Sequence, residues 1–144
     1  MYMSNNIEKS EIELLYEKFR DQLKEELQID EMNLKEKSMK APSIKHYWVA
    51  RLMDQRLNLY KYKKYRKEAA KKVFESIKAD DPVKLSDLII NKRVSENELI
   101  SKIDNAIGET ELLIKFLEDT VDKVCKNISY DINNIIEINK LETT

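Results

Sequence analysis

A strongly basic stretch with three tyrosines, YKYKKYRKEAAKK, occupies residues 60–72 near the middle of the chain. Seven of its thirteen residues are Lys or Arg, and Glu68 is its one acidic residue. Ammonium groups bind phosphate oxygens, and the face of a tyrosine ring can stack on an unpaired base. The stretch can therefore hold a polyanion such as a single-stranded nucleic acid, or it can be the solvated side of an ordinary long helix.

The charge of this stretch is not balanced by its neighbours in the sequence. Residues 42–72 carry ten basic and two acidic side chains, whereas residues 95–144 carry five basic and eleven acidic ones, within a net charge of −1. With so few carboxylates nearby, pairs at i,i+4 cannot neutralise it. Three partners can do so: a nucleic acid, an acidic protein surface (the C-terminal third of this chain or of a neighbour), and an acidic membrane. Nucleic acid is the first choice of the three.

A long helix from about residue 43 to 79 is predicted to present the basic stretch. Pro42 suits the first turn of a helix, and Asp80-Asp81-Pro82 ends it because the residue before a proline avoids the α region. At about 100° per residue one side is apolar and forms the predicted core face: Ile44, Trp48, Leu52, Leu59, Tyr62, Ala69, Val73 and Ile77. The opposite side carries Met53, Leu57, Tyr60, Lys64, Lys67 and Lys71, flanked by Arg56 and Lys63 on one edge and by Lys61, Tyr65 and Lys72 on the other.

The rest of the chain is also predicted to be helical, in one all-α domain over residues 1–144. One Gly, two Pro and 37% charged residues favour long helices over a sheet. Ser10 with Glu13, and Ser95 with Glu98, have the spacing of capping boxes. They predict an N-terminal helix at 10–28 and a C-terminal helix or helices at 96–141. The connector 83–94 contains Leu88-Ile89-Ile90, which fits a short helix or a strand.

Apolar residues recur every seven positions through the predicted C-terminal helix, which is typical of a coiled coil. The seven-residue series is Ile100, Ile107, Ile114, Val121, Ile128 and Ile135. The positions three residues further on are Ile103, Thr110, Leu117, Val124, Asp131 and Ile138, and Leu99, Ala106 and Leu113 widen the stripe. We expect this stripe to pack on helix 43–79 as an elongated helical hairpin, either alone or with a subunit contact as well. Asp131 in the seam predicts a break near residues 127–131, and Gly108 lies off the seam.

Residue patterns of common enzymes are missing from the sequence. It has no Gly-rich phosphate loop, no GxSxG and no HExxH, and one His and one Cys cannot make a common zinc site. His46 is expected to be a packing or surface residue, and Cys125 to be buried and inert. We therefore predict a non-enzyme with no catalytic residue, metal or cofactor. There is no apolar run long enough to span a bilayer and no secretory signal, and the lone cysteine fits a reducing cytoplasm.

Two stretches of the sequence have the pattern of a known family. One is LQIDEMNLKEKSMKAPSIKHYW at residues 27–48, where an L-x-I-D start leads to a proline and then to an aromatic pair that opens a long basic helix. The other is INNIIEINKL at residues 132–141, which is similar to the C-terminal helix of the same family. Both resemble the UvsY-like recombination mediator proteins of T-even-type phages and their marine relatives, and the resemblance covers about residues 11–141 in the same order. The family pattern has paired aromatics and a Gly after the basic run, where this chain has Lys72-Val73-Phe74-Glu75-Ser76.

The resemblance implies a protein that binds single-stranded DNA, contacts the phage single-strand-binding protein and loads the strand-exchange recombinase. It implies a homo-oligomeric ring, heptamer-like, assembled through the C-terminal helix in the cytoplasm of the infected bacterium. Combined with the face of the helix, it assigns DNA binding to Arg56, Tyr60, Lys61, Lys63, Lys64, Arg66, Lys67, Lys71 and Lys72. The expected subunit contacts are Val121, Val124, Ile128, Ile132, Ile135, Ile136, Ile138 and Leu141. The alternative is a coiled-coil structural or adaptor protein whose basic helix docks on acidic protein surfaces, with no DNA role.

Overall fold

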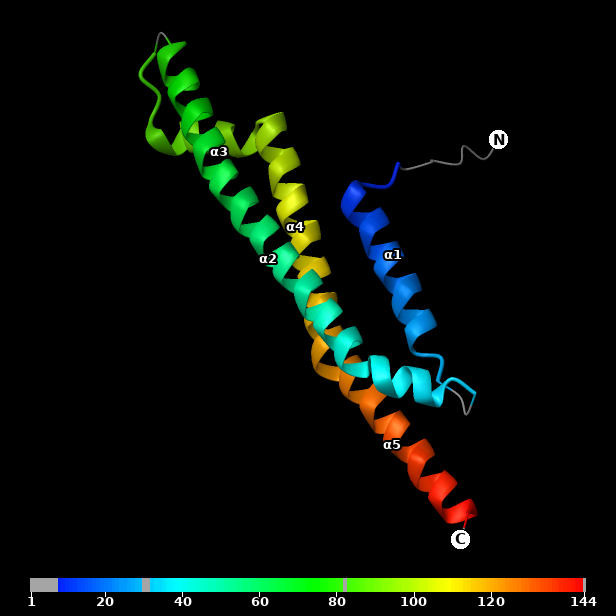
Figure 1. The fold of residues 1–144 in the computed structure, drawn as a ribbon. Coiled ribbons are helices and arrows are strands. Elements are labelled where there is room, and N and C mark those ends of the chain that lie inside the picture. The colour runs from blue at the N-terminus through cyan, green and yellow to red at the C-terminus, as the bar shows by residue number, and fades with distance from the viewer. Residues whose placement is uncertain (1–7, 30–31, 82, 144) are drawn as a thin grey trace, which may run out of the picture. The chain divides into compact units, whose positions relative to one another are not determined.

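The computed structural model describes residues 8–29, 32–81 and 83–143, and within these residues the chain is helical and contains no β-strand. The all-α class predicted from the sequence is confirmed. The helices are α1 (Glu11–Glu26), α2 (Leu34–Ala79), α3 (Asp87–Glu96), α4 (Glu98–Asp119) and α5 (Cys125–Glu142), with a π-helical turn, η1 (Thr120–Val124), before α5 (Figure 1). Among the residues described, no helix combines the length and apolar character that crossing a bilayer requires.

The chain divides into two compact units, which are treated separately. The first unit contains the residues up to Leu52 together with those from Lys115 onward, and the second contains Met53–Ile114. The long helix α2 and the helix α4 each contribute to both units. The basic stretch at residues 60–72 lies entirely in the second unit.

Helix α1 begins at the predicted N-cap. The Ser10 hydroxyl accepts a hydrogen bond from the Glu13 backbone N–H at 3.1 Å, which satisfies one of the amide donors that a helix start leaves without a partner. Phe19 and Leu23, four residues apart on one side of α1, are buried. The predicted first helix is confirmed, with its end at Glu26.

Helix α2 begins nine residues before the predicted start, so the prediction that Pro42 lies in the first turn of this helix is wrong. It starts at Leu34, and Pro42 lies inside it. Good helix formers precede the proline, and Lys40 Nζ pairs with Glu36 Oε1 at 2.6 Å across one turn, which also lowers the pKa of the Glu36 carboxyl. These contributions oppose the cost of a proline within a helix. Figure 1 shows α2 bending in its cyan part, as an internal proline predicts. The helix ends at Ala79, and Pro82, expected to end it, lies outside the described residues.

The start of α4 differs from the predicted capping box. Ser95 lies within α3, where its hydroxyl donates to the Lys92 carbonyl at 2.7 Å. The cap is Asn97, whose side-chain oxygen accepts from the backbone N–H of Leu99 at 2.9 Å and of Ile100 at 3.3 Å. Asparagine is as good an N-cap as serine, and the segment before it is helical rather than extended. The segment left open as helix or strand is therefore helix α3.

The first unit has a core built around the single tryptophan. Trp48 of α2 is fully buried, and its ring meets Phe19 of α1 edge to face at 5.7 Å between centroids. Its indole Nε1 donates to Glu26 Oε2 at 2.8 Å, so the one polar atom of the ring is satisfied. Tyr16 and Phe116 add a second edge-to-face pair at 5.1 Å, joining α1 to the last turns of α4. The predicted inward orientation of Trp48 is thus observed.

The second unit has its own apolar core from three helices. Ala69 of α2, Ile90 and Val94 of α3, and Ile100 and Ile103 of α4 are buried together. The half-buried residues packed against them are Ala70, Val73, Phe74, Ile77, Leu85 and Ile107. The side of α2 that was predicted to face the core does pack into the core of this unit. The hydrophobic effect on that side directs the opposite side of the helix toward solvent.

The apolar series of the last third passes through η1 instead of breaking near residues 127–131. Those residues belong to α5, so the predicted position of the break is wrong. The irregularity comes earlier, where the Cys125 N–H bonds the Thr120 carbonyl five residues back. Thr120 and Cys125, also five apart, are both buried, because the wider π turn returns to the same side after five residues. The buried hydroxyl of Thr120 donates to the Phe116 carbonyl at 2.8 Å.

Candidate nucleic-acid interface

The exposed side of α2 in the second unit carries the tyrosines and lysines that the sequence singled out. Tyr60 is 66% exposed and Tyr65 is 52% exposed, whereas Tyr62 is half-buried on the core side and Ala69 is buried. The lysines of this exposed face are Lys61, Lys64, Lys67, Lys71 and Lys72. We call these five lysines, with Tyr60 and Tyr65, the basic face. The predicted division of the helix into a core side and an outward side is observed here.

Four residues of the basic face form a short, straight row because of their spacing along one helix. Tyr60, Lys64, Lys67 and Lys71 follow each other at steps of four, three and four residues, which keeps them on one side of an α-helix. From the first to the last of them the helix advances by about 16 Å, at about 1.5 Å per residue. A row of this kind can follow the phosphates of an extended strand for a few nucleotides.

Two of the nine predicted DNA-binding residues are instead held by acids of α4. The Arg66 guanidinium binds Asp104 through two contacts, Nε to Oδ1 at 2.5 Å and Nη2 to Oδ2 at 3.4 Å. This hydrogen bond raises the pKa of Arg66. Lys63 Nζ lies 3.7 Å from Glu111 Oε1. Asp104 and Glu111 are seven residues apart, so one side of α4 neutralises one edge of α2.

The lysines of the basic face differ in their contacts from Arg66 and Lys63. Within the residues that the structure describes, none of these five forms an ion pair with a carboxylate. Like charges three or four residues apart on a helix repel one another. The face is thus a surface whose charge remains to be neutralised from outside the described chain.

Apolar side chains continue the same side of α2 before Tyr60. Leu57 is 50% exposed and Met53 is 51% exposed, one and two turns before Tyr60 respectively. Arg56, at the edge of the row, is also exposed. The buried polar residue of this region is Gln55, 7% exposed on the core side, which the apolar pattern did not include.

The predicted subunit-contact residues occupy three different environments. Ile128 and Ile132 are buried inside the first unit, at 2% and 5% exposure. Ile138 and Leu141, near the end of α5, are 52% and 76% exposed. The remaining four, Val121, Val124, Ile135 and Ile136, are half-buried. The two exposed residues are therefore the ones whose side chains can reach another molecule without any change in the protomer.

Two further predicted positions have simple environments. Cys125 is 5% exposed, and burial raises the pKa of its thiol, which matches the expected inert packing residue. His46 is an exposed residue of α2, in agreement with one of the two roles expected for it.

A comparison with protein families decides which family this chain is related to. The family model described as "Recombination, repair and ssDNA binding protein UvsY" matches residues 22–144. The chain belongs to the UvsY family. The match contains both stretches whose resemblance was noted in the sequence, at residues 27–48 and 132–141, and it includes the first helix from residue 22 onward.

Solved structures show that this UvsY-family chain has the fold of a phage protein of similar length. Crystal structures of the bacteriophage T4 recombination mediator protein UvsY match it in three lattice forms, types IV, II and I, with TM-scores of 0.73, 0.71 and 0.70. The alignments cover 87–89% of this chain and 97–98% of the T4 chains, at 15–16% sequence identity. A comparison with curated protein sequences finds no match.

The sequence located the basic face but missed two sets of residues next to it. One is the pair of acids on α4, Asp104 and Glu111, which form ion pairs with two of the α2 cations that were predicted to bind DNA. Their spacing of seven on the helix predicted to pack beside α2 was the signal that could have found them. The other is a pocket between α2 and α3, for which the sequence carries no signal because it depends on how α3 folds back.

Proposed function

We propose that this UvsY-family chain is a single-stranded-DNA-binding recombination mediator in the homologous recombination and repair of a phage. The observation that carries the proposal is the basic face, with five lysines lacking a carboxylate partner among the described residues and two exposed tyrosines next to them. The name of the family supports the same ligand.

The basic face would bind a strand through phosphates and bases at the same time. The lysines neutralise phosphates and release counterions, which gives affinity without sequence preference. Tyr60 and Tyr65 offer ring faces to unstacked bases, which a duplex does not present. Reading a duplex would require side chains directed into a groove, commonly Arg or Asn, whereas lysine dominates here. The chemistry therefore favours a single strand over a duplex.

The mediator role requires more than one copy and more than one partner. We propose a ring-shaped homo-oligomer, heptamer-like as the resemblance implies, in which Ile138 and Leu141 contact a neighbouring subunit. Several copies of a modest face on one strand add up to a high affinity through effective concentration. Such an assembly would load the strand-exchange recombinase onto DNA covered by the phage single-strand-binding protein, in the cytoplasm of the infected bacterium.

The test is DNA binding at two salt concentrations together with the mass in solution. We expect an oligomer that binds a labelled single-stranded oligonucleotide more tightly than the matching duplex, with an affinity that falls steeply with salt. A protein with no affinity for the single strand at low salt would contradict the proposal. A monomer that binds the strand would contradict the ring but would still support single-stranded DNA as the ligand.

The second candidate is an adaptor whose basic helix docks on acidic protein surfaces. The Arg66–Asp104 and Lys63–Glu111 contacts favour it, since they show that carboxylates of this chain do neutralise α2. An adaptor predicts assembly that dissociates with salt and no DNA affinity. The same two measurements therefore separate the two functions.

A further inference from the structure

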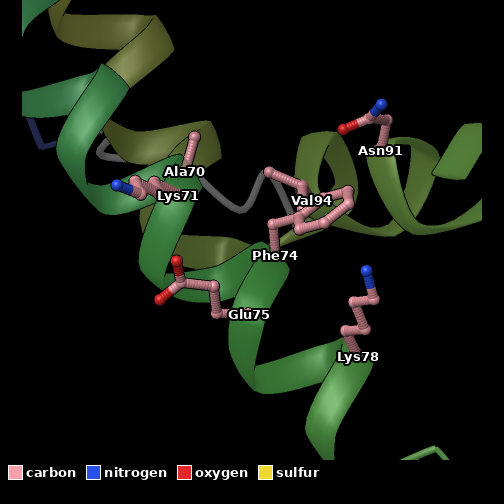
Figure 2. Close-up of a pocket in the computed structure, with 7 residues that line it drawn as sticks. All are labelled: Ala70, Lys71, Phe74, Glu75, Lys78, Asn91 and Val94. Atoms are coloured by element: carbon pink, nitrogen blue, oxygen red, sulfur yellow. The ribbon is translucent and has the colours of Figure 1, made fainter.

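An open pocket lies between α2 and α3, directly after the last lysines of the basic face and within the second unit. Its volume is about 490 Å³, and small-ligand sites commonly measure roughly 300–1,000 Å³. The residues that line it are Ala70, Lys71, Phe74, Glu75 and Lys78 of α2 and Asn91 and Val94 of α3 (Figure 2).

The floor of the pocket is apolar and firmly held. Phe74 is half-buried and packs against the core of the second unit, and Val94 belongs to that core at 6% exposure. Figure 2 shows the Phe74 ring beside Val94, with Ala70 one turn earlier on α2. An aromatic ring fixed in this way loses little side-chain entropy when a flat ligand stacks on it.

The rim of the pocket is polar and has both charges. Lys71 and Lys78 are seven residues apart, so the helix separates them by about 10 Å. In Figure 2 the Lys78 side chain extends from α2 toward α3, on which Asn91 lies, while Lys71 and Glu75 lie on the other side of the Phe74 ring. An asparagine amide donates and accepts hydrogen bonds, as the edge of a nucleobase does.

We propose that this pocket receives one nucleobase of the strand that the basic face holds. Lys71 belongs to both sites, so a strand bound along the row ends at the mouth of the pocket. Phe74 stacks on the base, Asn91 bonds to its edge, and Lys71 and Lys78 contact the flanking phosphates. The Glu75 carboxylate repels phosphate and accepts from an exocyclic amino group, which directs the base and not the backbone inward.

The inference rests on the proposed DNA-binding function, and the experiment separates the two. Binding is measured for labelled oligodeoxycytidylate and for an abasic oligonucleotide of equal length, with the full chain and two variants. Phe74→Leu keeps apolar packing and removes the ring. Asn91→Ala removes the amide at an exposed position, so folding is not at risk, and Asn105→Ala, at an exposed position of α4 away from the pocket, is its matched control.

The parent should bind the base-bearing strand more tightly than the abasic one. Phe74→Leu should weaken binding of the base-bearing strand about fivefold or more, and Asn91→Ala about two- to tenfold. Neither variant should change the affinity for the abasic strand, and Asn105→Ala should match the parent on both. If Asn91→Ala binds oligodeoxycytidylate as tightly as the parent, the base pocket is wrong while DNA binding stands. If the parent binds neither strand, the proposed function is wrong and the pocket falls with it.

Discussion

Replacing Lys64 and Lys67 with alanine should weaken single-stranded DNA binding and flatten its dependence on salt. Both residues are exposed on the basic face, and neither pairs with a carboxylate among the described residues. Each phosphate contact to a single strand contributes about 0.7 to the slope of log affinity against log salt, so five lysines give about 3.5 per protomer and the variant about 2.1. For each protomer that contacts the strand, a fourfold rise in salt then lowers the affinity of the parent about a hundredfold and that of the variant about twentyfold.

Fluorescence anisotropy with a labelled oligonucleotide, between about 50 and 200 mM salt, measures both slopes. The matched control is Lys102→Ala with Lys115→Ala, which removes the same charge from exposed positions of α4 and should keep the slope of the parent. Alanine favours helix, so circular dichroism and the mass in solution should not change in either variant. A Lys64 and Lys67 variant with the affinity and slope of the parent would show that the DNA-binding surface is elsewhere.

Four further outcomes follow from the contacts described. Asp104→Asn should release the Arg66 guanidinium and raise single-stranded DNA affinity about two- to fivefold at low salt, while urea denaturation shows a loss of less than about 1 kcal/mol for this exposed pair. Trp48→Ala should lower the free energy of unfolding by about 3–5 kcal/mol in the same assay, because it empties a fully buried site and leaves Glu26 without the indole donor. Leu141→Asp should reduce the oligomer mass in sedimentation without loss of helicity, and an unchanged mass would remove this residue from the subunit contact. Burial raises the pKa of Cys125, so alkylation of its thiol in the folded chain should reach half its maximal rate at a higher pH than in urea. For the same reason the folded state should lose stability as the pH rises past the unfolded thiol pKa of about 8.5.

The sequence predicted the parts of the fold that depend on periodicity. Apolar residues at steps of three and four predicted the core side of α2, including Trp48 and Ala69. The exposure of Tyr60 followed, because this residue lies on the opposite side. Ser10 was correctly predicted as an N-cap, because a capping hydrogen bond depends only on neighbouring residues in the sequence. The start of α2 was missed because the helix formers and the Glu36–Lys40 pair before Pro42 outweigh the usual boundary at a proline.

Features that depend on how two segments meet were beyond the sequence. Ser95 had the right spacing for a cap, but α3 continues through it and Asn97 takes the role. The basic run was visible as seven cations in thirteen residues, and only the structure shows that Arg66 is bound to an acid of α4. The pocket beside Phe74 arises from the packing of α3 on α2, which no pattern within either helix encodes.

The π-helical turn η1 is a place where the chain can lose one residue without turning the helix that follows. A π turn is what remains when one residue is inserted into an α-helix without moving its ends. Deleting one residue between Thr120 and Val124 would therefore restore a regular α-helix without rotating the residues that follow. Cys125, Ile128 and Ile132 would stay in the interior, and the exposed end of α5 would keep its direction. The same deletion in a regular part of α5 would instead rotate the residues after it by about 100°. We expect natural relatives to differ in length by one residue at η1 more readily than within α5.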